Sequence, residues 1–154
     1  MRFEQLMPFL ADPTENDAFD DLLEQLRFKG RPKGPDLTNF IRTPDKKVTA
    51  TFHADVSFNK YFPDTPHKSE GSYLLSGIGS EPGGAELPYG LDWTMDFEKI
   101  RGVIGEPKEV DPTVVTFVRD GLMLTVRFKD EKRNQLTSAT LSLIDVYTKK
   151  RFGI

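Results

Sequence analysis

An Asp-Gly dipeptide between two predicted strands fixes much of the topology of the C-terminal half. Residues 114–119 and 122–129 flank Asp120-Gly121, and in the second run Leu122, Leu124, Val126 and Phe128 alternate with Met123, Thr125, Arg127 and Lys129. Such alternation places one face of a strand on a core and the other in water. Asp-Gly favours a type I′ turn, because both central residues of that turn need a positive φ. The segment therefore predicts an antiparallel hairpin, and residues 136–144 are predicted to add a third strand.

A short helix is predicted ahead of this hairpin, over residues 97–104. Asp96 can serve as its N-cap, Gly105 supplies the position after its end, and Pro107 blocks its continuation. The stripe expected to be buried consists of Phe97, Ile100, Val103 and Ile104. The last residues, 147–154, are expected either to extend the third strand or to pack as a tail.

The N-terminal half also begins with a predicted helix, over residues 17–28. Its apolar residues recur at helical spacing, at Phe19, Leu22, Leu23 and Leu26. Gly30 is the expected left-handed stop, and Pro32 follows it. A weaker helix over residues 2–10 is interrupted by Pro8.

Strict alternation over residues 47–59 predicts a long strand. A polar connection over residues 61–69 leads to another predicted strand at 71–78. Residues 80–88 are rich in Gly and Pro and are predicted to link the two halves.

The whole pattern predicts an α+β protein of one domain, residues 1–154. The halves, about 1–79 and 87–154, resemble each other in pattern: each is predicted to be a helix followed by an antiparallel meander. We expect two similar units that share a core or a continuous sheet. An apolar fraction of 37% with 12 Phe residues is sufficient for an aromatic-rich core.

Several chemistries are excluded by residue type. The chain has no Cys, so thiolate catalysis, disulfides and Cys-ligated metals are ruled out. No apolar run reaches the length of a signal peptide or a membrane span, so we expect a cytoplasmic protein with no membrane partner. The only histidines, His53 and His67, do not have metal-ligand spacing and are expected at the surface.

Phosphate-binding and hydrolase motifs are also missing. Residues 76–80, Ser-Gly-Ile-Gly-Ser, resemble a phosphate loop but do not have the GxxxxGK[ST] spacing. Paired carboxylates are too common among 24 acids to identify a catalytic pair. We therefore predict a protein that is not an enzyme and that uses no cofactor and no metal.

Charge is unevenly distributed along the chain. Residues 1–30 hold seven acids against three bases, and residues 81–111 hold eight against three. Residues 119–154 hold eight bases against four acids, which is too dilute to predict nucleic-acid binding. The acidic segments are either ordinary solvated surface or a surface for a basic protein partner. The residues predicted to contact that partner are Asp17, Asp20, Asp21, Glu24, Glu86, Tyr89, Asp92 and Trp93, although Trp93 equally suits a core anchor.

One stretch resembles a known family. Residues 87–93, Leu-Pro-Tyr-Gly-Leu-Asp-Trp, precede the predicted helix, and Ile104-Gly105-Glu106-Pro107 closes it. This arrangement resembles the LPxGL…helix…LGxP pattern of bacterial immunity proteins from polymorphic-toxin and contact-dependent growth inhibition systems. The sequence departs from that pattern at Trp93-Thr94 and at Lys99. The resemblance implies a protein that neutralises a cognate toxin by binding it.

Two other functions fit the same residues. The chain could instead be a structural or adaptor module that forms a homodimer through an open sheet edge. It could also be a small enzyme with a cleft between its halves, which would require converging polar groups with perturbed pKa values.

Overall fold

The computed structural model describes residues 1–12, 16–30, 32, 34–66 and 72–154. The elements, in chain order, are α1 (Phe3–Leu6), the 3₁₀ turn η1 (Met7–Phe9), α2 (Asp17–Gln25), β1 (Thr38–Arg42), β2 (Val48–Ala54), α3 (Asp55–Tyr61), β3 (Tyr73–Ser80), α4 (Phe97–Ile104), β4 (Glu109–Val110), β5 (Val114–Arg119), β6 (Leu122–Phe128), β7 (Leu136–Leu143) and α5 (Val146–Phe152).

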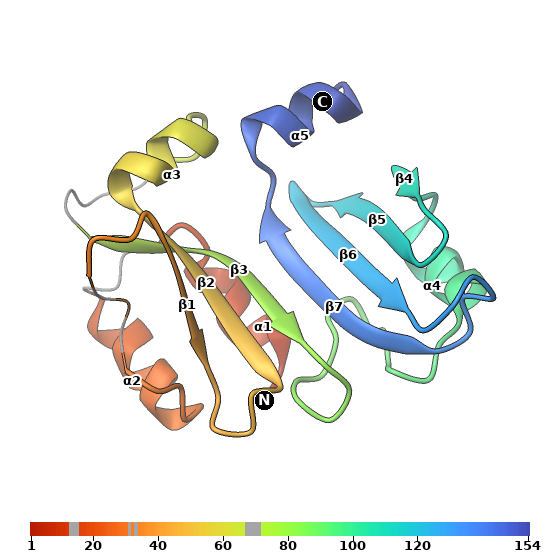
Figure 1. The fold of residues 1–154 in the computed structure, drawn as a ribbon, viewed down its shortest axis with the longest axis horizontal. Coiled ribbons are helices and arrows are strands. Elements are labelled where there is room, and N and C mark those ends of the chain that lie inside the picture. The colour runs from red at the N-terminus through yellow and green to blue at the C-terminus, as the bar shows by residue number, and fades with distance from the viewer. Residues whose placement is uncertain (13–15, 31, 33, 67–71) are drawn as a thin grey trace.

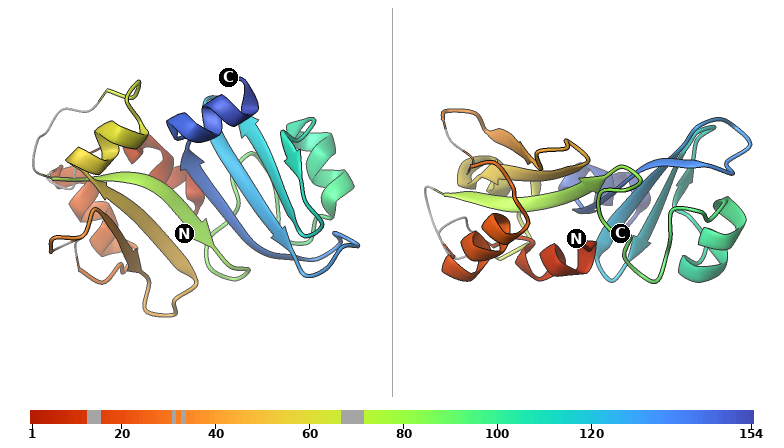
Figure 2. Two further views of the ribbon diagram at one scale, coloured as in Figure 1. Left: turned by 45° about the horizontal axis from the view of Figure 1, so that its top comes forward. Right: turned by 90° about the horizontal axis from the view of Figure 1, so that it is seen from below.

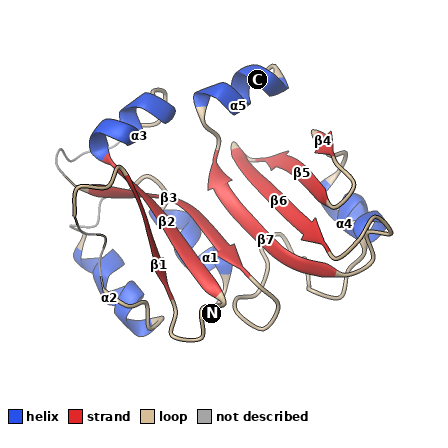
Figure 3. Ribbon diagram, viewed as in Figure 1, coloured by secondary structure: helices blue, strands red, loops and turns tan. Residues whose placement is uncertain are grey.

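The strands form one antiparallel sheet of seven, in the order β1-β2-β3-β7-β6-β5-β4 (Figure 1). β3 and β7 pair in its middle, with Ile78 opposite Leu141. The meander β1–β2–β3 is thereby joined to the meander β5–β6–β7. The predicted α+β class and the continuous sheet are confirmed, and Figure 3 shows the separation of helices from strands.

The structure gives no evidence of two repeated units. In the N-terminal half the helix α3 is inserted between β2 and β3, whereas β5, β6 and β7 follow one another without a helix. The C-terminal half has an extra edge strand, β4, and ends in α5. The two sequence patterns are similar because in each half an amphipathic helix packs on the same face of an antiparallel sheet.

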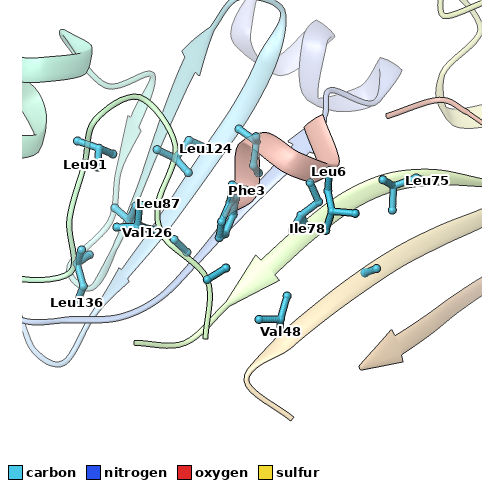
Figure 4. Packing of buried hydrophobic residues seen from close by; sticks show 14 of the residues in the cluster. Phe3, Leu6, Val48, Leu75, Ile78, Leu87, Leu91, Leu124, Val126 and Leu136 are labelled. Carbon is cyan, nitrogen blue, oxygen red and sulfur yellow. The ribbon is translucent and has the colours of Figure 1, made fainter. Parts of the chain in front are cut away.

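Three helices, α1, α2 and α4, lie on one face of the sheet (Figure 2). The side chains beneath them form one core that extends across both halves. Phe3 and Leu6 of α1 are fully buried near the junction of the halves, among Ile78, Leu87 and Val126 (Figure 4). Burial of a large apolar side chain contributes about 1.5–3 kcal/mol, so this four-residue helix is held by its packing.

The segment predicted as a linker, residues 80–88, is tied to the N-terminus. The backbone N–H of Phe3 donates to the carbonyl of Glu86 (3.0 Å), and the N–H of Glu86 donates to the carbonyl of Met1 (2.9 Å). Ala85 and Leu87 are buried in the shared core. The segment therefore packs as part of the core between the halves.

The predicted strand over 47–59 is wrong beyond residue 54. β2 ends at Ala54, and α3 begins at Asp55. Phe58 and Phe62, four residues apart, turn toward Leu74 and form a second small cluster with it. Val56, which strand alternation would bury, is 70% exposed. The alternation continued by chance into a segment whose Phe spacing also fits a helix.

The predicted end of the first helix is also wrong. α2 ends at Gln25, and Arg27, with φ 63°, takes the left-handed position expected at Gly30. The N–H of Phe28 donates to the carbonyl of Leu23 (3.0 Å), and both side chains are buried. This hydrogen bond and apolar contact define a Schellman motif, which ends the helix before the glycine is reached.

The C-terminal residues 147–154 do not extend the last strand. They form α5, because the carboxylate of Asp145 caps the N–H groups of Tyr147 and Thr148 (3.0 and 2.9 Å).

Two further elements, β1 and β4, were not predicted. Val103, expected in a buried stripe, is 43% exposed on α4.

The helix, the hairpin and the third strand predicted for the C-terminal half are confirmed. Asp120 and Gly121 have φ values of 52° and 77° between β5 and β6. The carboxylate of Asp96 accepts from the N–H of Lys99 (2.9 Å), and α4 spans the predicted residues.

Candidate functional site

The two faces of the sheet differ in chemistry. The face under α1, α2 and α4 carries the buried apolar residues of β2, β3, β5, β6 and β7. The opposite face carries mostly Thr, Ser and Gly, and only its α3–α5 end is covered by helices (Figure 1). Tyr61 of α3 and Tyr147 of α5 meet there, with ring centroids 6.0 Å apart. We call this opposite side the open face.

Two glycines of β3, Gly77 and Gly79, lie at the centre of the open face. Their register partners on β2 and β7 are hydroxyl residues: Thr49, Thr51, Thr140 and Ser142. A strand without side chains between two rows of side chains forms a trough. Glycine inside a strand often marks a place where another molecule approaches the backbone.

Two hollows lie along this trough and share Thr51 and Thr140 in their walls. The upper hollow, near α3 and α5, has a volume of about 360 Å³. The lower hollow, near the β1–β2 turn, has a volume of about 340 Å³. Because the hollows share two wall residues, we treat them as one groove.

His53 is the polar centre of the upper hollow. Its Nδ1 lies 2.7 Å from the hydroxyl oxygen of Ser76. The ring is half-buried between the edges of Tyr61 and Phe62, with centroid distances of 5.8 and 5.3 Å. The prediction that His53 is a surface histidine is therefore wrong. His67 lies outside the described residues.

Ser76 reaches His53 because of a β-bulge. Thr51 is in register with Gly77 and Phe52 with Leu75, so Ser76 is the extra residue of β3. A bulge redirects the side chain of its extra residue. The Ser76 hydroxyl can donate to the carbonyl of Thr51 (3.2 Å), and we assign His53 Nδ1–H as the donor to Ser76 in the 2.7 Å contact.

In this assignment His53 does not act as a base toward Ser76. A nucleophilic hydroxyl needs a base that accepts its proton, and the proton of Ser76 is directed to a carbonyl. The other ring nitrogen of His53, Nε2, has no hydrogen-bond partner among the residues that the structure describes. Nε2 is the ring's free acceptor.

Burial lowers the pKa of His53 from its usual 6.5, while the nearby charge of Asp145 opposes the shift. The imidazole is therefore mainly neutral at neutral pH. Asp145 lines the same hollow and uses its carboxylate to cap α5. Within the described residues, no group of three or more metal-ligating side chains lies together.

The lower hollow has a different chemistry. Its charged walls, among the residues that the structure describes, are three bases, Arg42, Lys46 and Lys47, and one acid, Glu81. Phe40 of β1 adds an aromatic side chain that is 59% exposed. The lower end of the groove is therefore positively charged and partly apolar.

The eight residues predicted to contact a partner fall in two places, both away from the groove. Those on α2, at Asp17, Asp20, Asp21 and Glu24, adjoin a hollow of about 270 Å³ that the last three line. Glu86 and Trp93 line another hollow of about 280 Å³ near the N-terminus. α1 lies between the two places (Figure 1), so the structure does not bring the eight residues together.

Three of these residues have structural partners. Trp93 is half-buried and its Nε1–H donates to the carbonyl of Ala85 (2.9 Å), as a core anchor would. Asp92 accepts from the N–H and hydroxyl of Thr94, which lowers its pKa. Tyr89, with φ 62°, packs its ring under the guanidinium of Arg119 at 4.9 Å, and burial raises its pKa.

The sequence reasoning missed the groove residues. Gly77-Ile78-Gly79 inside a predicted strand was a usable signal, because glycine is unfavourable in strand interiors without a local reason. No sequence signal connects Ser76, His53 and Asp145, which come from three separate segments.

Compared with known proteins, the chain matches no family model, no curated protein and no solved structure. In the parts of the chain that the structure describes, every helix is too short or too polar to be a membrane span.

Proposed function

We propose that this protein is a bacterial immunity protein that binds a cognate toxin domain in the cytoplasm and neutralises it by direct contact. The groove on the open face is the observation that carries the proposal. Binding needs a rigid surface with apolar pockets and polar groups that can be satisfied by a partner. The groove combines both on paired strands.

The glycine trough supports a protein partner in particular. At Gly79, which is half-buried, a partner's chain can approach the β3 backbone between the hydroxyl rows. Thr and Ser hydroxyls both donate and accept, so they can satisfy a partner's polar groups as contact excludes water.

The charge of the groove predicts part of the toxin surface. Arg42, Lys46 and Lys47 at the lower end suit an acidic segment of the toxin. The acidic residues of α2 and of segment 86–93 lie on the other side of the sheet and remain a prediction for a basic toxin. We place the principal contact in the groove.

A matched pair of variants tests this placement. Thr140 is exposed and lines both hollows, so Thr140→Arg would lay a long charged side chain across the groove. Thr137, exposed on the same strand, lines neither hollow, so Thr137→Arg is the control. Each variant is co-expressed with the toxin domain encoded by the neighbouring gene. Survival of the cells and co-purification of the toxin domain with the variant are scored. We expect that Thr140→Arg neither protects the cells nor co-purifies with the toxin domain, and that Thr137→Arg does both.

Charge reversal on α2 separates the two surfaces. If the groove is the contact, Asp21→Lys and Glu24→Lys keep protection. If these variants lose protection while Thr140→Arg keeps it, α2 is the interface and the groove is not. If the wild-type chain does not protect against the toxin domain, the immunity function itself is wrong.

A homodimeric adaptor is the second candidate, and the edge of the sheet favours it. β1 is an outer strand, and Leu37 and Phe40 beside its edge are each 59% exposed. Exposed strand edges with apolar side chains promote pairing with another chain. Light scattering of the pure protein distinguishes the candidates: a dimer that Phe40→Lys converts to a monomer supports the adaptor.

A further inference from the structure

We propose that the upper hollow is the receptor for one aromatic side chain of the toxin, a tyrosine or tryptophan, whose O–H or N–H donates to Nε2 of His53. This inference rests on the proposed function and names the chemistry of the partner at one end of the groove. Aromatic anchors in pockets are the residues that most often dominate protein–protein binding energy.

The walls of the hollow suit a flat apolar group. Tyr61 of α3, the following residue Phe62, Met123 of β6 and Leu143 of β7 line it. Its volume of about 360 Å³ lies in the range of pockets that hold small organic groups. Gly77 lines the hollow and adds no side chain to it.

The hydrogen-bonding state of His53 selects the polar group. Nδ1 is satisfied by Ser76, and Nε2 has no partner among the described residues. A half-buried acceptor beside aromatic rings is stabilised by a donor that arrives with the ligand. A phenol O–H or an indole N–H supplies such a donor on an otherwise apolar ring.

The charge around the hollow excludes a competing class of ligand. Among the described residues that line the hollow, Asp145 is the one acid, and His53 is mainly neutral at neutral pH. A carboxylate would have no donor on Nε2 and would be repelled by Asp145. An ammonium would be attracted by Asp145, but it would lose its hydration against Phe62 and Leu143. A neutral aromatic ring with an O–H or N–H can donate to Nε2. It carries no charge, so it is not repelled by Asp145 and loses no ionic hydration against Phe62 and Leu143.

The first experiment uses small probes and the isolated chain. p-Cresol stands for a tyrosine side chain, toluene for the same ring without the donor, and n-butylammonium for a lysine. NMR titration should give a dissociation constant on the order of millimolar for p-cresol. Toluene should bind about fivefold more weakly, since it lacks one hydrogen bond. The Nε2 resonance of His53 should shift with p-cresol only.

Two variants keep this test interpretable. Thr140→Arg should abolish p-cresol binding because the new side chain covers the hollow, and Thr137→Arg should leave it unchanged. His53→Phe should remove the advantage of p-cresol over toluene. Equal affinities for p-cresol and toluene in the wild type, tighter binding of n-butylammonium, or binding that survives Thr140→Arg would each overturn the inference.

The second experiment separates this inference from the proposed function. Affinity for the toxin domain should fall about tenfold in His53→Phe, because the partner's donor is left unsatisfied. If His53→Phe binds the toxin as tightly as the wild type, the aromatic anchor is wrong and the immunity function stands. If the wild-type chain binds p-cresol but no toxin, the hollow is real and the immunity function fails.

Discussion

The imidazole of His53 and the hydroxyl of Ser76 are joined by a 2.7 Å hydrogen bond between adjacent strands of the sheet. Ser76 reaches the ring because it is the extra residue of a β-bulge in β3. With Nδ1–H assigned as the donor to Ser76, Nε2 is the acceptor of the upper hollow. The following predictions begin with this pair.

Ser76→Ala should lower the free energy of unfolding by about 1–3 kcal/mol, because it leaves His53 Nδ1–H and the carbonyl of Thr51 without the Ser76 hydroxyl as their partner. Urea denaturation measures the change. Ser138→Ala is the control, since Ser138 is a half-buried serine on β7, and its change should stay within about 0.5 kcal/mol. Equal effects of the two substitutions would mean that the Ser76 hydroxyl contributes no specific stability.

Stability should fall as the pH drops through the range where His53 titrates. Burial lowers the pKa of folded His53 below 6.5, so between that folded value and 6.5 the unfolded chain binds more protons. The contribution of the neutral ring is complete above 6.5 and is lost as the pH falls toward the folded pKa. Urea denaturation between about pH 7.5 and pH 5 should show this decline, and His53→Phe should reduce it.

Asp145→Asn tests the cause of the shift. Asn caps a helix about as well as Asp, so α5 should persist. The pKa of His53 should fall further, because the negative charge of Asp145 opposes the effect of burial. NMR titration of the ring measures it, and an unchanged or raised pKa would contradict the assigned cause.

Two Gly→Ala substitutions should have opposite signs. Gly102 lies within α4, and a Cβ there would meet no atom within 4 Å, so Gly102→Ala should stabilise the protein by about 0.5–1 kcal/mol. A Cβ on Gly84 would lie 2.5 Å from Ser80 Oγ and 2.9 Å from Val48 Cγ2. Gly84→Ala should therefore cost about 1–3 kcal/mol. Thermal denaturation measures both, and a stabilising Gly84→Ala would contradict the packing described for this turn.

Replacing Arg27 by Gly should stabilise the end of α2. Arg27 is exposed and has φ 63°, a conformation that costs a side-chain-bearing residue about 1–2 kcal/mol. The melting temperature should rise by about 2–4 °C for each kcal/mol gained.

Arg133→Gly is the contrasting control for Arg27→Gly. Arg133 also has a positive φ, of 54°, but its guanidinium donates to the carbonyls of Asp111 and Pro112, each at 3.1 Å. Its replacement loses these bonds, so no net gain is expected. A similar rise in both variants would show that the guanidinium contacts of Arg133 add no stability.

For the C-terminal half, the preferences of neighbouring residues were sufficient to predict the hairpin and the helix α4. The positive φ values at Asp120 and Gly121 and the capping of α4 by Asp96 follow from residue chemistry within a few positions. Such features depend on the backbone preferences of neighbouring residues, and long-range packing agrees with them here.

The N-terminal half shows where local rules are insufficient. Residues 55–59 continue the alternation of β2, yet they form the first turns of α3, because Phe58 packs with Phe62 on Leu74. A period of two and a spacing of four can coexist in one short apolar segment. Only packing against a neighbouring strand decides between them.

The sequence by itself determined the α+β class, the hairpin, and the residue types available for binding. Tertiary structure alone decided that β3 pairs with β7, that a bulge directs Ser76 toward His53, and that Asp145 stands beside them. These three residues lie far apart in the chain. Their contact depends on strand register and helix placement, which are set by burial of the whole core and not by the preferences of any local segment.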